Sequence, residues 1–136
     1  MIPKVDFQQH EVLFQAFFFP VEYGGRRDKL LADIESFTTF FAKHQEKILG
    51  LIEKFSGFSW RQEKIPVFLI PRNSMVPFSF TKARLEANLP GVVQKIGWEN
   101  KRVLHIFIHE LGHVICRQND FYEKYKQLEQ HPMLVH

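Results

Sequence analysis

A long apolar pattern between Asp28 and Phe55 places the strongest constraint on how this chain can fold. Apolar side chains and one histidine recur there at alternating spacings of four and three residues: Leu30, Ile34, Phe37, Phe41, His44, Ile48, Leu51 and Phe55. Such spacings put the side chains on one face of an α-helix. The sequence therefore predicts one long amphipathic helix, whose apolar stripe needs a second apolar surface to cover it. His44 is interpreted as a core or boundary residue, because no ligand at metal-binding spacing accompanies it.

Three shorter segments have the apolar and β-branched composition of strands. Glu11 to Phe19 is rich in valine, leucine and phenylalanine and ends at a proline. Ile65 to Ile70 is bracketed by Pro66 and Pro71, so we expect this strand to lie where missing amide donors are tolerated. Gly91 to Trp98 is expected at an edge of the sheet, because proline and glycine border it.

Two further helices follow the last strand. Asn100 is a candidate N-cap for a helix from about Lys101 to Arg117, and Asn119 or Asp120 could cap a short helix from Phe121 to Gln130. The chain has no internal repeat and no linker of different composition, and its 136 residues suit one domain. We therefore expect a single α+β domain over residues 1–136.

Composition and charge exclude several classes of function. The formal net charge is only +3, and the basic residues are spread along the chain, so nucleic acid binding has no support. The single cysteine, Cys116, cannot form an internal disulfide, and the N-terminal residues do not resemble a signal peptide. No apolar run is long enough to cross a membrane as a helix. These features predict a cytoplasmic protein.

The pentapeptide His109-Glu110-Leu111-Gly112-His113 carries the clearest chemistry in the sequence. Residues four apart lie on one face of a helix, so both histidines can present an imidazole to one zinc ion. Zinc with an open position activates a water molecule, and Glu110 is placed to act as its general base. Gly112 is unfavourable inside a helix, which suggests that another element packs against it.

The phrase IFIHELGH and the order of predicted elements resemble the zincin metallopeptidases, and the small size resembles the minimal gluzincins. The resemblance implies a zincin-like α+β fold: a small mixed sheet, a long backing helix, an active-site helix and a short C-terminal helix. It also implies a zinc ion, hydrolysis of peptide bonds, and a peptide or protein substrate that lies antiparallel along the edge strand Gly91 to Trp98.

The third zinc ligand is less well defined by the sequence. The metzincin pattern needs glycine at the third and histidine or aspartate at the sixth residue after His113, but these positions hold Cys116 and Asn119, so the metzincin subclass is not supported. Gluzincins place a glutamate on a later helix, and Glu129 shares a helical face with Phe121, Tyr125 and Leu128. Glu129 is the predicted ligand. The alternative ligands are Asp120, His131 and His136. Asp120 is also predicted to form a capping box with Glu123.

Other residues and other functions stay open at this point. His105 and Cys116 lie on the helical face of the two histidines and are interpreted as core residues, with support of the metal site as the alternative. Tyr122, Tyr125 and His131 are candidates for stabilising an oxyanion. The alternative functions are a non-catalytic zincin-like binding or regulatory module, a peptidase inhibited by its own tail His131 to His136, and a purely structural helical module.

Overall fold

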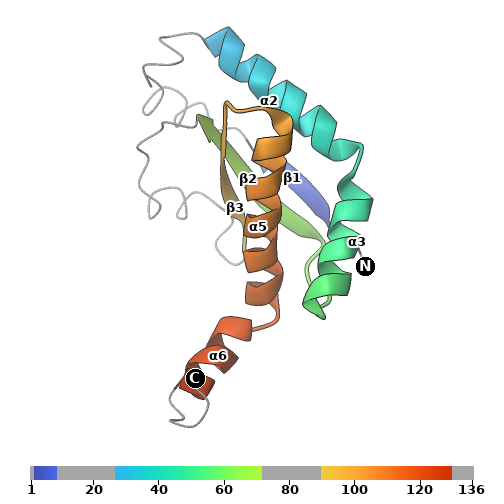
Figure 1. Ribbon diagram of the computed structural model, residues 1–136, viewed down its shortest axis with the longest axis vertical. Helices are drawn as coiled ribbons and strands as arrows, with labels where there is room; N and C mark the ends of the chain where they lie inside the picture. Colours follow the sequence, from blue (N-terminus) through green and yellow to red (C-terminus); the bar gives the residue numbers. More distant parts are fainter. Residues whose placement is uncertain (1, 9–26, 72–89, 130–136) are drawn as a thin grey trace.

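The computed structural model describes residues 2–8, 27–71 and 90–129 (Figure 1). The predicted strand Glu11 to Phe19 lies outside these residues. Within them, no helix is both long enough and apolar enough to pass through a membrane. In chain order the described elements are β1 (Lys4–Gln8), α2 (Arg27–Ala42), α3 (Gln45–Ser56), β2 (Lys64–Pro71), β3 (Val92–Ile96), α5 (Asn100–Gln118) and α6 (Phe121–Glu129).

The three described strands form a parallel sheet in the order β1-β2-β3. Val5 aligns with Ile65, and Val67 aligns with Val92. The prediction of a mixed sheet is therefore wrong for these strands. Parallel neighbours need a crossover connection, and α2 and α3 lie within the connection from β1 to β2. Helices and strands are thus mixed as predicted, but they alternate, as in α/β units, instead of being segregated.

Strand β2 lies between β1 and β3 although it contains two prolines. The amide of Lys4 donates to the carbonyl of Glu63 at 2.8 Å, so the polar groups of odd-numbered residues in β2 face β1 and those of even-numbered residues face β3. In the described part of the chain, residues 64–68 of β2 pair with β1, and residues 67–71 pair with β3. Pro66 faces β3 before that pairing begins, and Pro71 faces β1 after that pairing has ended. Neither proline interrupts these ladders, as expected.

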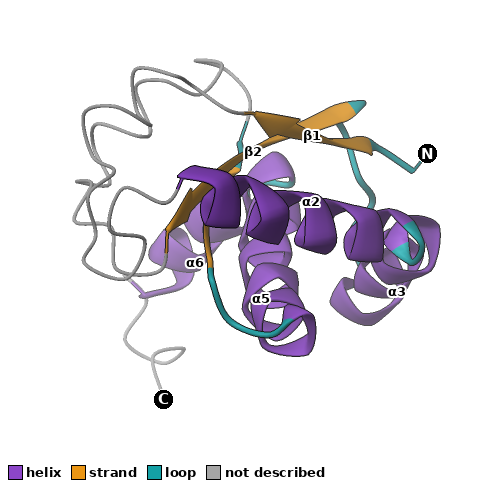
Figure 2. Ribbon diagram, turned by 90° about the horizontal axis from the view of Figure 1, so that it is seen from above, coloured by secondary structure: helices purple, strands orange, loops and turns teal. Residues whose placement is uncertain are grey.

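The core lies between the sheet and the helices α2, α3 and α5, which Figure 2 shows on one side of the sheet. Four phenylalanines from β1, α2 and α5 meet there: Phe7, Phe37, Phe41 and Phe107. The ring centroids of Phe41 and Phe107 are 5.1 Å apart, and those of Phe37 and Phe107 are 5.7 Å apart, both edge-to-face. Such pairs are favourable beyond the area they bury, so this cluster fixes α5 against the sheet.

The predicted helix from Asp28 to Phe55 is in fact two helices that meet at a turn around His44. The amide of His44 donates to the carbonyl of Phe41 at 2.9 Å, which closes a tighter turn than the α-helix does. After the turn, the buried face of α3 differs from the predicted apolar stripe. Leu49, which is not on the stripe, is buried, whereas Phe55, which is on it, is 80% exposed. His44 itself is exposed, so its interpretation as a core or boundary residue is wrong.

Candidate metal centre

Helix α5 has one buried face and one face that carries the pentapeptide. The buried face packs on the sheet and on α2 and α3. Its N-cap is Glu99 and not Asn100 as predicted, since Asn100 is the first helical residue. The side-chain amide of Asn100 donates to the hydroxyl of Ser36 at 3.0 Å. The helix extends one residue beyond the predicted Arg117. Its buried residues are Val103, Phe107, Leu111, Val114, Ile115 and Gln118.

His109 and His113 come together on the face of α5 opposite the buried one, as their spacing predicts. Their Nε2 atoms are 3.1 Å apart, and their ring centroids are 4.7 Å apart with the planes nearly perpendicular, at 86°. His109 is exposed and His113 is half-buried. The two Nε2 nitrogens therefore converge on one point that is accessible from solvent.

This convergence fits the coordination geometry of zinc. Two imidazole nitrogens that each lie about 2.0 to 2.1 Å from a tetrahedral zinc ion are about 3.3 Å from each other. The observed separation of 3.1 Å between the Nε2 atoms of His109 and His113 is close to that value. The same separation also suits a hydrogen bond between the two rings, so the distance is compatible with zinc binding by both nitrogens.

Tyr122, at the start of α6, is the closest partner of His113. Its hydroxyl is hydrogen-bonded to Nδ1 of His113, and the two rings stack with centroids 6.0 Å apart. Burial is the main reason why the pKa of the Tyr122 hydroxyl is raised above its ordinary value. Charge on Cys116 and Glu110 raises this pKa further, whereas Arg117 lowers it. Tyr122 is therefore a neutral phenol near neutral pH.

Glu110 lies next to His109 in sequence and is half-buried on α5. Its negative charge contributes to the raised pKa of Tyr122, so its carboxylate is within electrostatic range of that hydroxyl. The role of Glu110 as general base stays a prediction.

The third ligand is not identified within residues 2–8, 27–71 and 90–129, because no three histidine, cysteine, aspartate or glutamate side chains gather there as a metal site. The side chain of Glu129 and the residues His131 and His136 lie outside this part of the chain. Asp120 is exposed and has a left-handed backbone with φ of 56°. Its predicted capping box with Glu123 is absent from the hydrogen bonds of the described residues; its carbonyl accepts from the amide of Lys124 instead.

Asn119, at one metzincin position, has a structural role. Its side-chain amide donates to the carbonyls of Ser59 and Ile115, at 2.9 Å each, and its side-chain oxygen accepts from Nε of Arg61 at 2.7 Å. The side-chain oxygen of Gln118 accepts from the backbone amide of Arg61, also at 2.7 Å. The partly buried hydrogen bonds to Ser59 and Arg61 fix the end of α5 to the loop before β2.

Cys116 and His105 flank the histidine pair on the same face of α5. Burial raises the pKa of the Cys116 thiol, which favours the thiol over the thiolate that binds metals. Cys116 is half-buried and packs against the core, in line with its interpretation as a core residue. His105 is exposed, so the same interpretation is wrong for His105.

Among the described side chains, two expectations about packing near the pentapeptide find no support. A Cβ added to Gly112 would meet no atom within 4 Å, so no described element packs closely on this glycine. In α6, Phe121 is 38% exposed and Tyr125 is 49% exposed, so the face that was expected to point inward is largely open along these residues. Among residues 121–126 of α6, Tyr122 is half-buried and the others are exposed.

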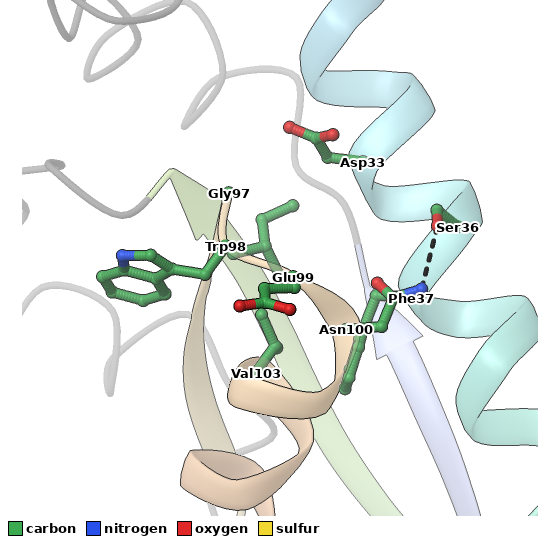
Figure 3. Close-up of a pocket in the computed structure, with 9 residues that line it drawn as sticks. Asp33, Ser36, Phe37, Gly97, Trp98, Glu99, Asn100 and Val103 are labelled. Atoms are coloured by element: carbon green, nitrogen blue, oxygen red, sulfur yellow. Dashed lines mark hydrogen bonds between the residues drawn. The ribbon is translucent and has the colours of Figure 1, made fainter.

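A pocket of about 220 Å³ lies at the other end of α5, between α2 and the β3–α5 turn (Figure 3). Val103 in its wall is six residues before His109, which corresponds to about 9 Å along the helix axis. This pocket is therefore separate from the histidine pair. Its lining residues are Asp33, Ser36, Phe37, Ile96, Gly97, Trp98, Glu99, Asn100 and Val103.

Comparisons with known proteins find no matching family model, no significantly similar curated protein and no significantly similar solved structure.

The sequence did not single out the contact between Tyr122 and His113. From the sequence, Tyr122 is one of three candidates for stabilising an oxyanion. Nine residues and a helix junction separate the two side chains, so no periodicity within one helix could reveal their contact.

Proposed function

We propose that this chain is a zinc-dependent hydrolase of peptide bonds, with His109 and His113 as metal ligands and Glu110 as general base. The observation that carries the proposal is the separation of 3.1 Å between the two Nε2 atoms, which suits a single zinc ion. The resemblance of HELGH to the zincin motif supports the same chemistry. The substrate class is a peptide or protein, and the compartment is the cytoplasm.

The reaction needs an activated water and a group that takes its proton. A zinc ion held by His109 and His113 would supply the Lewis acid that lowers the pKa of water toward neutrality and polarises the substrate carbonyl. Glu110 accepts the proton as the water attacks the carbonyl and delivers it to the leaving amine. His109 and His113 would supply two imidazole ligands, and Glu129 the third protein ligand, with Asp120, His131 and His136 as alternatives.

Strand β3 is the element proposed to bind the substrate. In the described sheet it lies at an edge, and only three residues separate its last residue, Ile96, from the start of α5. An extended peptide can add to such an edge through main-chain hydrogen bonds, which would bring a peptide bond toward the helix that carries Glu110. The proposed peptide runs antiparallel to β3.

Zinc content of the purified full chain tests the ligand assignment. We expect one zinc per chain in the wild type and little zinc in His109→Ala or His113→Ala. His105→Ala is the matched control, because His105 is exposed on the same helix one turn earlier and should leave the zinc content unchanged. Wild-type protein that takes up no zinc would refute the proposal.

Cleavage of an unstructured protein tests the catalytic step. We expect hydrolysis that a chelator stops and that zinc restores. Glu110→Gln should bind zinc normally and lose activity by roughly 10²-fold or more, since the general base is removed. If the wild type binds zinc and cleaves none of a broad set of peptides, the chain is a zinc-binding module and not an enzyme.

A further inference from the structure

The ring of His113 is engaged at both nitrogens. Nε2 faces Nε2 of His109 at 3.1 Å, and Nδ1 is hydrogen-bonded to the hydroxyl of Tyr122. The two nitrogens of an imidazole point in different directions, so Tyr122 does not occupy the position on which the histidine pair converges. We infer that Tyr122 is a positioning residue, whose hydroxyl oxygen accepts the Nδ1 proton of His113 and so presents Nε2 to zinc. The inference rests on the proposed zinc site.

The direction of this hydrogen bond follows from the chemistry of a neutral imidazole, which carries one proton on its two nitrogens. A ring that offers the Nε2 lone pair to a metal must keep its proton on Nδ1. His113 is half-buried, so this N–H needs a partner from the protein, and Tyr122 provides the oxygen. His109 is exposed and has less need of such a partner.

The junction between α5 and α6 holds Tyr122 in place. Asn119 ends α5, and its buried side chain is tied to the loop before β2. Asp120 takes the left-handed conformation that turns the chain into α6, and Phe121 packs edge-to-face on Phe58, with centroids 5.9 Å apart. The hydroxyl of Tyr122 therefore approaches His113 from a defined position at a helix start.

Tyr122→Phe removes the hydroxyl and keeps the ring, and Tyr125→Phe is the matched control on the exposed face of the same helix. The first measurement is the ¹⁵N signals of the His113 ring in metal-free protein, at a pH where the ring is neutral. We expect the wild type and Tyr125→Phe to carry the proton on Nδ1, and Tyr122→Phe to shift toward the Nε2-protonated form. Circular dichroism checks that both variants are folded.

The second measurement is zinc affinity by competition with a chelator. We expect Tyr122→Phe to bind zinc about 10 to 100-fold more weakly than the wild type, and Tyr125→Phe to bind it equally well. Unchanged ring signals or unchanged zinc affinity in Tyr122→Phe would overturn the inference and leave the proposed function intact. If the wild type binds no zinc, the proposed function fails, and the ring signals still decide whether Tyr122 sets the tautomer.

Discussion

At the scale of single residues, Gly112 is unfavourable for the helix, and no packing contact of the described residues requires it. It lies inside α5, where glycine is less favourable than alanine because its backbone loses more freedom on folding. A Cβ at this position would meet no atom within 4 Å, so close packing does not explain the glycine. The fold of the described residues therefore gains no stability from Gly112.

Gly112→Ala should stabilise the protein by about 0.5 to 1 kcal/mol, because the substitution lowers the entropy of the unfolded chain without a steric conflict. The free energy of unfolding in urea measures this change. Gly57→Ala is the control: a Cβ there also meets open space, but φ is 75°, so it should destabilise by about 1 kcal/mol. Equal effects of the two substitutions would contradict the explanation.

At the scale of secondary structure, the junction of α5 and α6 connects the fold to the candidate site. The side chain of Asn119 joins α5 to Ser59 and Arg61 in the loop before β2. Tyr122 follows three residues later and contacts His113. The position of α6, and with it that of Tyr122, therefore depends on hydrogen bonds made outside the two helices.

Asn119→Ala should destabilise the protein by roughly 1 to 3 kcal/mol, because buried polar groups lose their partners. Zinc affinity should fall as well, since the start of α6 loses its anchor. Thermal unfolding and chelator competition measure the two effects. Asn100→Ala, at the exposed other end of α5, should change stability by less than about 0.5 kcal/mol and leave zinc affinity unchanged.

Several elements could be predicted from local patterns, whereas the helix break at His44 and the strand β1 could not. The observed β3, α5 and α6 match the predicted segments closely, since apolar periodicity and adjacent proline or glycine mark them. The break at His44 was missed because the spacing of four and three continues through it in the sequence. Strand β1 was missed because Lys4–Gln8 has only two apolar residues, and its partners lie about sixty residues away.

At the scale of the whole molecule, stability depends on the contact of α5 with α2 and the sheet. Phe107 is fully buried and lies against Phe7, Phe37 and Phe41, so it joins three elements at one point. The pentapeptide begins two residues later on the opposite face of the same helix. The candidate site thus depends on this core for its support.

Phe107→Ala should reduce the free energy of unfolding by about 3 to 5 kcal/mol, because it leaves a cavity where three elements meet. Denaturant unfolding measures the loss. Phe55→Ala is the control, since Phe55 is 80% exposed and its removal should change stability by less than about 0.5 kcal/mol. Similar losses of unfolding free energy in both variants would show that the phenylalanine cluster contributes no more to stability than an exposed phenylalanine does.

The sequence by itself determined that His109 and His113 share a helical face, because backbone hydrogen bonds within one helix fix the geometry of residues four apart. It also determined the strand that precedes this helix. Only the tertiary structure decided that the described strands are parallel and that Tyr122 bonds to His113. These features depend on packing between segments that are distant in sequence, which no local pattern encodes.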